Sequence, residues 1–235
     1  SSLIVRVISK GIAADLLDSD DWTAFQAGVE GVKDFINLAD NVDQLSRDLL
    51  GSGSNLAANL DFTSLFNSSI VTTVSDYIAV GSPSVEGLVA ALLANDKIQS
   101  AVSRVSNDGT SVELDLLFKV LNTQSDVPVD LGSAASNLGL DLDADAKVNV
   151  VSEMVFEFTI GFDTTKDITT EADEAFYFSA DRLTFSVNAE STTINSTFTL
   201  DGLSGSIENG SLDLGATVTI AFSDPNRDGR FTLPW

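Results

Sequence analysis

The chain has 235 residues, lacks cysteine and histidine, and carries a formal net charge of -23 at pH 7, from 35 acidic and 12 basic residues. These absences exclude disulfides, thiolate or histidine-bound zinc and a Ser-His-Asp triad within the chain. The acidic balance disfavours nucleic acid and anionic membranes as partners. No apolar run reaches the roughly 18 residues that a membrane span needs.

The first half of the sequence is predicted to be mainly helical. Between Asp21 and Leu49, apolar residues recur at steps of three and four, which is the pattern of one amphipathic helix of roughly 28 residues. Ser19 or Asp20 is placed to cap its start, and Gly51 to end it. The apolar stripe, expected to pack on a sheet, consists of Trp22, Phe25, Val29, Val32, Phe35, Leu38, Val42, Leu45 and Leu49.

A shorter helix and a hairpin are predicted next. Residues 82–97 have a helical pattern that Ser82 or Ser84 can open. Residues 101–122 read as a β-hairpin, because residues 107–109 are Asn-Asp-Gly and tolerate the positive φ of a tight turn.

The second half changes to a period of two, which is typical of half-buried strands. From Ala146 to Phe162, apolar residues occupy even positions and mostly polar residues occupy odd ones. Residues 181–190 repeat this pattern and residues 196–222 continue it. The connections are short, so consecutive strands are expected to pair antiparallel. The predicted turns lie at residues 164–174, 201–205 and 208–210.

Together these elements predict an α+β fold: a helical N-terminal half, with one long amphipathic helix packed on a long-stranded, curved antiparallel sheet. The helix would span about 43 Å and the strand from Ala146 about 50 Å, so each can cover the apolar face of the other. We divide the chain into a mainly helical segment, residues 1–100, and an antiparallel β segment, residues 101–235, within one composite domain.

The segment SDPNRDGRF, residues 223–231, is the candidate metal site. Oxygen-bearing side chains stand at every second position before Gly229, as in the D-x-[DN]-x-[DN]-G start of an EF-hand loop. Calcium prefers about six to eight hard oxygen ligands on a tightly turned backbone. The expected Ca²⁺ ligands are the side chains of Asp224, Asn226 and Asp228, the carbonyl of Arg230, and Thr232 at the ninth position.

This loop is incomplete as an EF-hand, because its twelfth position is Trp235 where a bidentate Glu is usual. Another segment, a water or a neighbouring module would have to complete the coordination. The same residues also fit a metal-free Asx turn begun by Asp224 and Pro225.

Other polar motifs have plainer explanations. Alternating Asp141, Asp143 and Asp145 fit a solvated strand edge, and residues 18–21 fit a helix cap. Glu153 and Glu157 fall on the polar side of the long strand, so a carboxylate hydrolase is the least favoured function. Glycans are candidates at the three N-x-[ST] sequons, Asn67, Asn195 and Asn209.

The segments FEFTIGFDTT, AFYFSADRLTFSVNA and SLDLGATVTIAFSDPNRDGRFTL resemble a module of giant secreted or surface proteins, the calcium-binding, adhesin-like proteins of aquatic microbes. The resemblance covers about residues 140–233. It implies an extracellular, multi-module protein stiffened by calcium, and it supports Asp224, Asn226 and Asp228 as ligands.

The expected function is non-enzymatic: a secreted, calcium-stabilised structural or adhesive module of a larger surface or filament assembly, with other copies or neighbouring modules as partners. The alternative is a carrier of lipid or another apolar ligand, with a groove between helix and sheet. That groove would be lined by Phe156, Phe158, Ile160, Phe162, Phe185 and Phe222.

Overall fold

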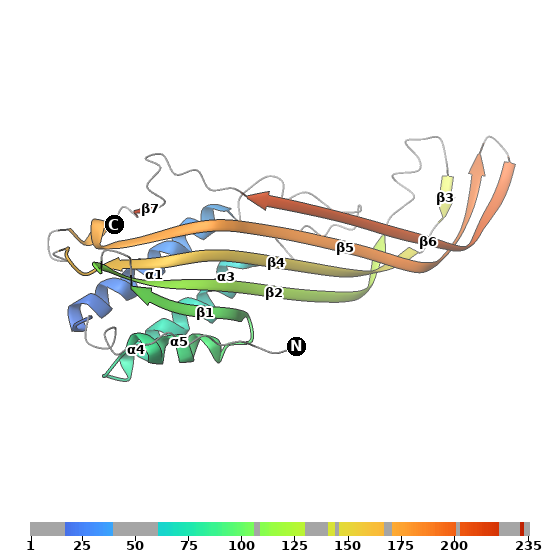
Figure 1. Cartoon of the computed structure of the whole chain (residues 1–235). Coiled ribbons are helices and arrows are strands. Elements are labelled where there is room, and N and C mark those ends of the chain that lie inside the picture. Colours follow the sequence, from blue (N-terminus) through green and yellow to red (C-terminus); the bar gives the residue numbers. More distant parts are fainter. Residues whose placement is uncertain are drawn as a thin grey trace.

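The computed structural model describes residues 17–39, 61–105, 109–129, 141–143, 146–166, 171–200, 203–220 and 231–232. Within them, a long antiparallel sheet is covered by helices at one end and continues beyond them as a narrow, curled ribbon (Figure 1). The α+β class and the curved antiparallel sheet are therefore confirmed.

Several helices, and not one long helix, cover the sheet. The predicted helix begins as expected, but its described part, α1, ends at Ala39, and residues 40–60 lie outside the described part of the chain. Residues 61–80, which the sequence left ambiguous, are mostly helical, and the first strand begins before residue 100. The helical elements are α1 (Ser19–Ala39), α3 (Phe62–Phe66), the π-helical η2 (Asn67–Val71), α4 (Thr72–Ala79), α5 (Val85–Leu93) and α7 (Ala172–Ala175).

The start of α1 is capped by Asp18, which belongs to the predicted cap segment 18–21 and stands one residue before Ser19, the first of the two named candidates. Its Oδ1 accepts hydrogen bonds from the backbone amides of Asp20 at 2.8 Å and Asp21 at 3.0 Å. In return, the Asp21 side chain accepts one from the Asp18 amide at 2.9 Å. This reciprocal arrangement satisfies amides that the first helical turn would otherwise leave unpaired. The predicted cap of α5 at Ser84 is confirmed.

All described strand pairs are antiparallel, as predicted. The sheet order is β1-β2-β4-β5-β3, and β6 and β7 also pair with β5. β4 matches the long strand predicted from Ala146, and β5 reaches about 80 Å at 3.3 Å per residue. The strands are β1 (Ile98–Val105), β2 (Ser111–Val129), β3 (Asp141–Asp143), β4 (Ala146–Asp163), β5 (Phe176–Leu200), β6 (Leu203–Ile220) and β7 (Phe231–Thr232).

The turn predicted at residues 208–210 is wrong. The chain stays in β6 there, and the pairing with β5 shifts register on either side of Ile194. Asn209 takes a positive φ of 55°. A β-bulge can absorb such a residue without ending the strand, and this is how the Asn-Gly pair is accommodated.

The core lies between the helices and the inner face of the sheet. The even positions of β4 point inward, as predicted, and Phe156, Phe158 and Phe162 are 0–2% exposed. Phe62 enters from α3, with ring centroids 5.7–6.1 Å from three sheet phenylalanines. A second, smaller cluster further along the sheet consists of Val148, Val150, Ala189 and Ile194.

A glycine sets how closely α1 approaches the sheet. A Cβ atom on Gly28 would lie 2.1 Å from Cδ2 of Phe176, a buried residue of β5. Because that distance is far below van der Waals contact, the helix can pack on this ring only with glycine at this position.

Candidate functional site

The predicted calcium loop lies mostly outside the described residues. Asp224, Asn226, Asp228 and Arg230 belong to that part, so their geometry stays a prediction. Thr232 belongs to β7, whose two residues pair with Tyr177 and Phe178 at the start of β5. The C-terminal side of the loop is therefore anchored to the helix-covered end of the sheet. Elsewhere, the described residues contain no group of three acids that could hold a metal ion.

Beside this anchor, a row of residues crosses the outer face of the sheet, the face opposite the helices. The cross-strand register places Arg104 of β1 beside Glu113 of β2, then Gly161 of β4, Tyr177 of β5 and Thr232 of β7. One row thus connects the β1 edge of the sheet with the strand that follows the candidate loop.

Hydrogen bonds and ion pairs hold this row together. The Tyr177 hydroxyl donates to Glu113 Oε1 at 2.7 Å, reaching across Gly161, where a Cβ atom would lie 2.1 Å from the tyrosine Cζ. Arg104 Nε lies 3.0 Å from carboxylate oxygens of both Glu113 and Asp115. Thr159 donates to Asp115 at 2.7 Å. The carboxylates are therefore engaged in holding neighbouring strands together.

The sequence did not identify this row. Tyr177 and Gly161 are separated by the whole β4–β5 connection, and their pairing depends on strand register. A glycine in the middle of a strand pattern was the available signal, since it often marks a place where another group approaches closely.

Glu153 and Glu157 occupy the outer face as predicted, and each has a cationic partner. Lys119 Nζ lies 2.7 Å from Glu153, and Arg182 donates to Glu157 at 2.7 Å. These side chains are about one-third or more exposed, so each pair contributes little to stability.

A shallow depression of about 380 Å³ lies further along the outer face, across β2, β4, β5 and β6. Leu121 and Val151 contribute exposed apolar surface, at 60% and 37% exposure. Glu153, the one titratable lining residue, is already paired with Lys119. The depression offers hydroxyl, amide and aliphatic contacts for a flat partner. Its lining residues are Leu121, Val151, Glu153, Ser186, Val187, Asn188, Gly215, Ala216 and Thr217.

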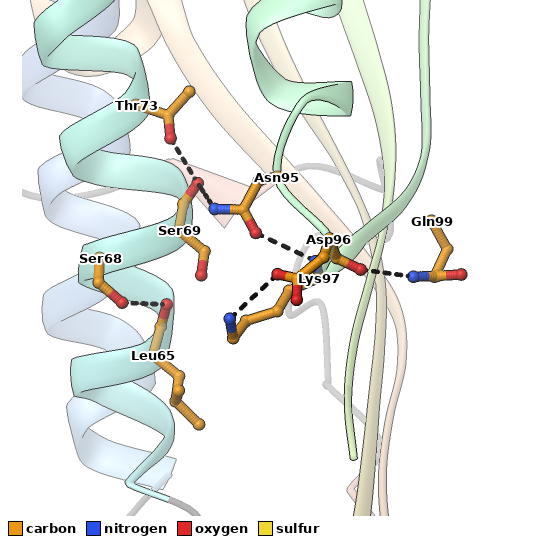
Figure 2. A network of polar contacts seen from close by, with 8 residues as sticks. All are labelled: Leu65, Ser68, Ser69, Thr73, Asn95, Asp96, Lys97 and Gln99. Atoms are coloured by element: carbon orange, nitrogen blue, oxygen red, sulfur yellow. Dashed lines mark hydrogen bonds and ion pairs between the residues drawn. The ribbon is translucent and has the colours of Figure 1, made fainter.

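The π-helical turn is tied to the start of the sheet by a polar network (Figure 2). The Ser69 carbonyl accepts from the Thr73 hydroxyl at 2.8 Å and from the Asn95 amide nitrogen at 3.5 Å. Asn95 Oδ1 in turn accepts from the backbone amide of Lys97 at 3.0 Å, just before β1. The network fixes the connection between α5 and β1, which is a structural role.

The three sequons lie in different surroundings. Asn67 is the exposed first residue of η2, so its sequon is helical. Asn195 and Asn209 are exposed on the β5–β6 ribbon, and Asn195 Oδ1 accepts from the Asn209 backbone amide at 3.0 Å. Two sequons are thus accessible on extended strands, and Asn195 also stabilises the bulge.

Two pKa shifts have local structural causes. Burial raises the pKa of Asp21, while the hydrogen bond from the Asp18 amide acts in the opposite direction. The pKa of Lys166 is raised mainly by its hydrogen bond to Glu174, with help from Glu171. Asp21 lies in the first turn of α1, and Lys166 lies in the turn that follows β4.

Comparisons with protein-family models, with curated proteins and with solved structures gave no match to this chain. None of the described helices is long and apolar enough to cross a membrane.

Proposed function

We propose that this protein is a non-enzymatic, secreted structural or adhesive module, stabilised by calcium and built into a larger surface or filament assembly. Its partners would be other copies of the chain or neighbouring modules of the same protein. The observation that carries this proposal is β5, a single strand of 25 residues that joins the helix-covered end to the distal ribbon.

The shape and polarity of the sheet support a structural role. β5 runs the full length of the described sheet, and its antiparallel neighbours brace it from both sides over residues 183–190. The described carboxylates of the outer-face row are held in ion pairs and hydrogen bonds between strands. Such an arrangement suits a spacer or display module, which must keep its shape while both ends make contacts.

Core packing favours this proposal over the apolar-ligand carrier. Five of the six residues expected to line a groove are described, and all five are at most 2% exposed. The ring centroids of Phe156 and Phe158 lie 4.3 Å apart, and from α3 the Phe62 ring packs on Phe156 and the Phe66 ring packs on Phe158. Side chains that already touch each other leave little room for a lipid between helices and sheet.

The calcium part of the proposal rests on the candidate loop at residues 223–231. Asp224, Asn226 and Asp228 supply hard oxygen ligands, and β7 fixes the chain directly after them against Tyr177 and Phe178. An ion bound there would stabilise the folded state, because the ligands converge only when the loop is anchored.

The test is thermal unfolding of the chain in chelator, in calcium and in magnesium at constant ionic strength. At calcium a hundredfold above Kd, binding adds about 2.7 kcal/mol, which raises Tm by roughly 5 to 10 °C for a chain of this size. Asp228→Ala should abolish the calcium-specific rise. Asp213→Ala, an equal charge change in exposed β6, should keep it.

Equal responses to calcium, magnesium and simple salt would overturn the calcium part, because screening of an acidic surface is not specific for an ion. A stable apolar ligand co-purifying with the chain, and displacing side chains of the phenylalanine core, would favour the carrier instead.

A further inference from the structure

We propose that the free edge of β6 pairs with the β6 edge of a second copy of this chain, antiparallel and around a two-fold axis. This inference rests on the proposed structural role and names the partner surface for it.

One edge of the described sheet is formed by β6, whose residues 212–220 pair with β5 without a register shift. β6 pairs with β5 along one side, and no other described strand lies along its far side (Figure 1). Its 18 residues include no lysine, arginine or proline. An exposed edge of this kind presents a row of backbone donors and acceptors that another strand can use.

The opposite edge carries more features that hinder strand pairing, although β6 also has one irregular stretch, at Asn209, where φ is 55°. α5 packs against β1, and beyond β1 the edge is formed by the distal part of β2. That part carries Lys119, the positive-φ residue Asp126 and Pro128, and its pairing with β4 shifts register between Gln124 and Val127. Lysine, proline, irregular backbone and a covering helix are devices that prevent strand pairing. β6 has no lysine or proline, and its irregular stretch ends before residue 212, so residues 212–220 are the edge segment available for a partner.

A second copy is the occupant that the described surfaces favour. Among the described edges, residues 212–220 of β6 form the longest regular segment without lysine, arginine or proline, so an equivalent partner is the same segment of another β6. Antiparallel pairing of identical strands is a two-fold contact, the commonest symmetry of soluble homo-oligomers. Leu203, Ile207 and Leu214 are 74%, 39% and 41% exposed, and pairing would cover part of this apolar surface.

Charge sets the conditions for this pairing. β6 carries two acids, Glu208 and Asp213, and no base, and each copy has a formal net charge of -23. Two paired copies therefore place four carboxylates along one seam. We expect association to weaken at low ionic strength and to strengthen when salt screens the repulsion.

The experiment is sedimentation velocity of the full chain across a concentration series, at about 50 mM and about 500 mM salt. We expect a monomer–dimer equilibrium that shifts toward dimer at the higher salt. Leu214→Lys should weaken the dimer at least tenfold, although it lowers the net negative charge. Val102→Lys is the matched control: it adds the same charge at a residue of similar exposure, 48%, on β1, and should leave the dimer unchanged. Circular dichroism would confirm that both variants fold.

The cysteine-free chain allows a second, independent readout. Single cysteines placed one at a time at residues 210–216 should form a disulfide between copies only near the two-fold axis, and Val102→Cys should form none. A chain that stays monomeric at every concentration and salt overturns the pairing. So does a dimer that Val102→Lys disrupts and Leu214→Lys does not, or one in which no β6 cysteine cross-links.

The two proposals fail separately. A strict monomer that still gains stability from calcium would overturn the pairing and leave the calcium-stabilised module. A β6-linked dimer without a calcium-specific rise in Tm would overturn the calcium site and leave the pairing.

Discussion

The helix-covered end of the sheet and the β5–β6 ribbon share a strand but differ in burial. At the covered end, Phe176 and Phe178 of β5 have no exposed surface. In the ribbon, every described residue of β6 is exposed or half-exposed. Both regions have strands that alternate apolar and polar residues, yet in the ribbon only a small cluster that includes Ala189 and Ile194 is buried. The helical layer helps to bury a much larger apolar cluster, and the free energy of unfolding grows with the apolar area buried.

The largest expected effect comes from removing a ring in the covered end. Phe62→Ala should lower the free energy of unfolding by about 3 to 5 kcal/mol, because it deletes a fully buried side chain and leaves a cavity. Ile207→Ala in the ribbon, 39% exposed, should change it by less than about 1 kcal/mol. Urea unfolding at low protein concentration measures both. Equal losses would mean that the ribbon has its own covered core, and the contrast would then be wrong.

Replacing one glycine by alanine in each region should change the free energy of unfolding by a smaller amount. Gly161→Ala should cost about 1 to 3 kcal/mol, because its Cβ atom would meet the Tyr177 ring at 2.1 Å and displace the hydroxyl from Glu113. Gly215→Ala in β6 meets no atom closer than 3.7 Å and should stay within about 0.5 kcal/mol of the parent chain. Tyrosine fluorescence and the urea midpoint follow both changes. A neutral Gly161→Ala would refute the close approach of the ring.

The smallest expected effect concerns the cap of α1, which also belongs to the covered end. Asp18→Ala should cost about 1 kcal/mol, because two backbone amides lose their acceptor. Asp18→Asn keeps an acceptor oxygen and should restore most of the stability. If the alanine and asparagine variants unfold at the same urea concentration, the side chain of Asp18 does not cap the helix.

Sequence periodicity predicted the strand faces well, because a face depends only on the order of residues along one strand. The bounds of β4 and its inward phenylalanines followed from that order. The cap of α5 at Ser84 was also predictable, because a cap depends on residues only a few positions apart. The turn predicted at residues 208–210 was wrong because Asn-Gly suits a bulge as well as a hairpin turn. The choice between them depends on the strand across from it.

The site was less predictable than the fold for the same reason. The Tyr177–Glu113 contact joins residues 64 positions apart, and no local pattern encodes it. The prediction of a single long helix was wrong. Periodicity indicates which residues form an apolar stripe, but it does not indicate how many helices cover the sheet. The calcium ligands remain a prediction from spacing, with β7 as their described anchor.

The continuity of β5 has a consequence for local unfolding. Its residues 176–180 are held by β4 under the helices, and residues 183–190 are held between β4 and β6. Beyond residue 190, β5 pairs with β6 and, at residues 197–199 only, with the three-residue strand β3. Amide hydrogen exchange along this one strand should therefore slow toward the middle and the covered end, and quicken toward Leu200. The hairpin tip could then open and close repeatedly while the phenylalanine core stays intact, so that one strand belongs to two cooperative units of different lifetimes.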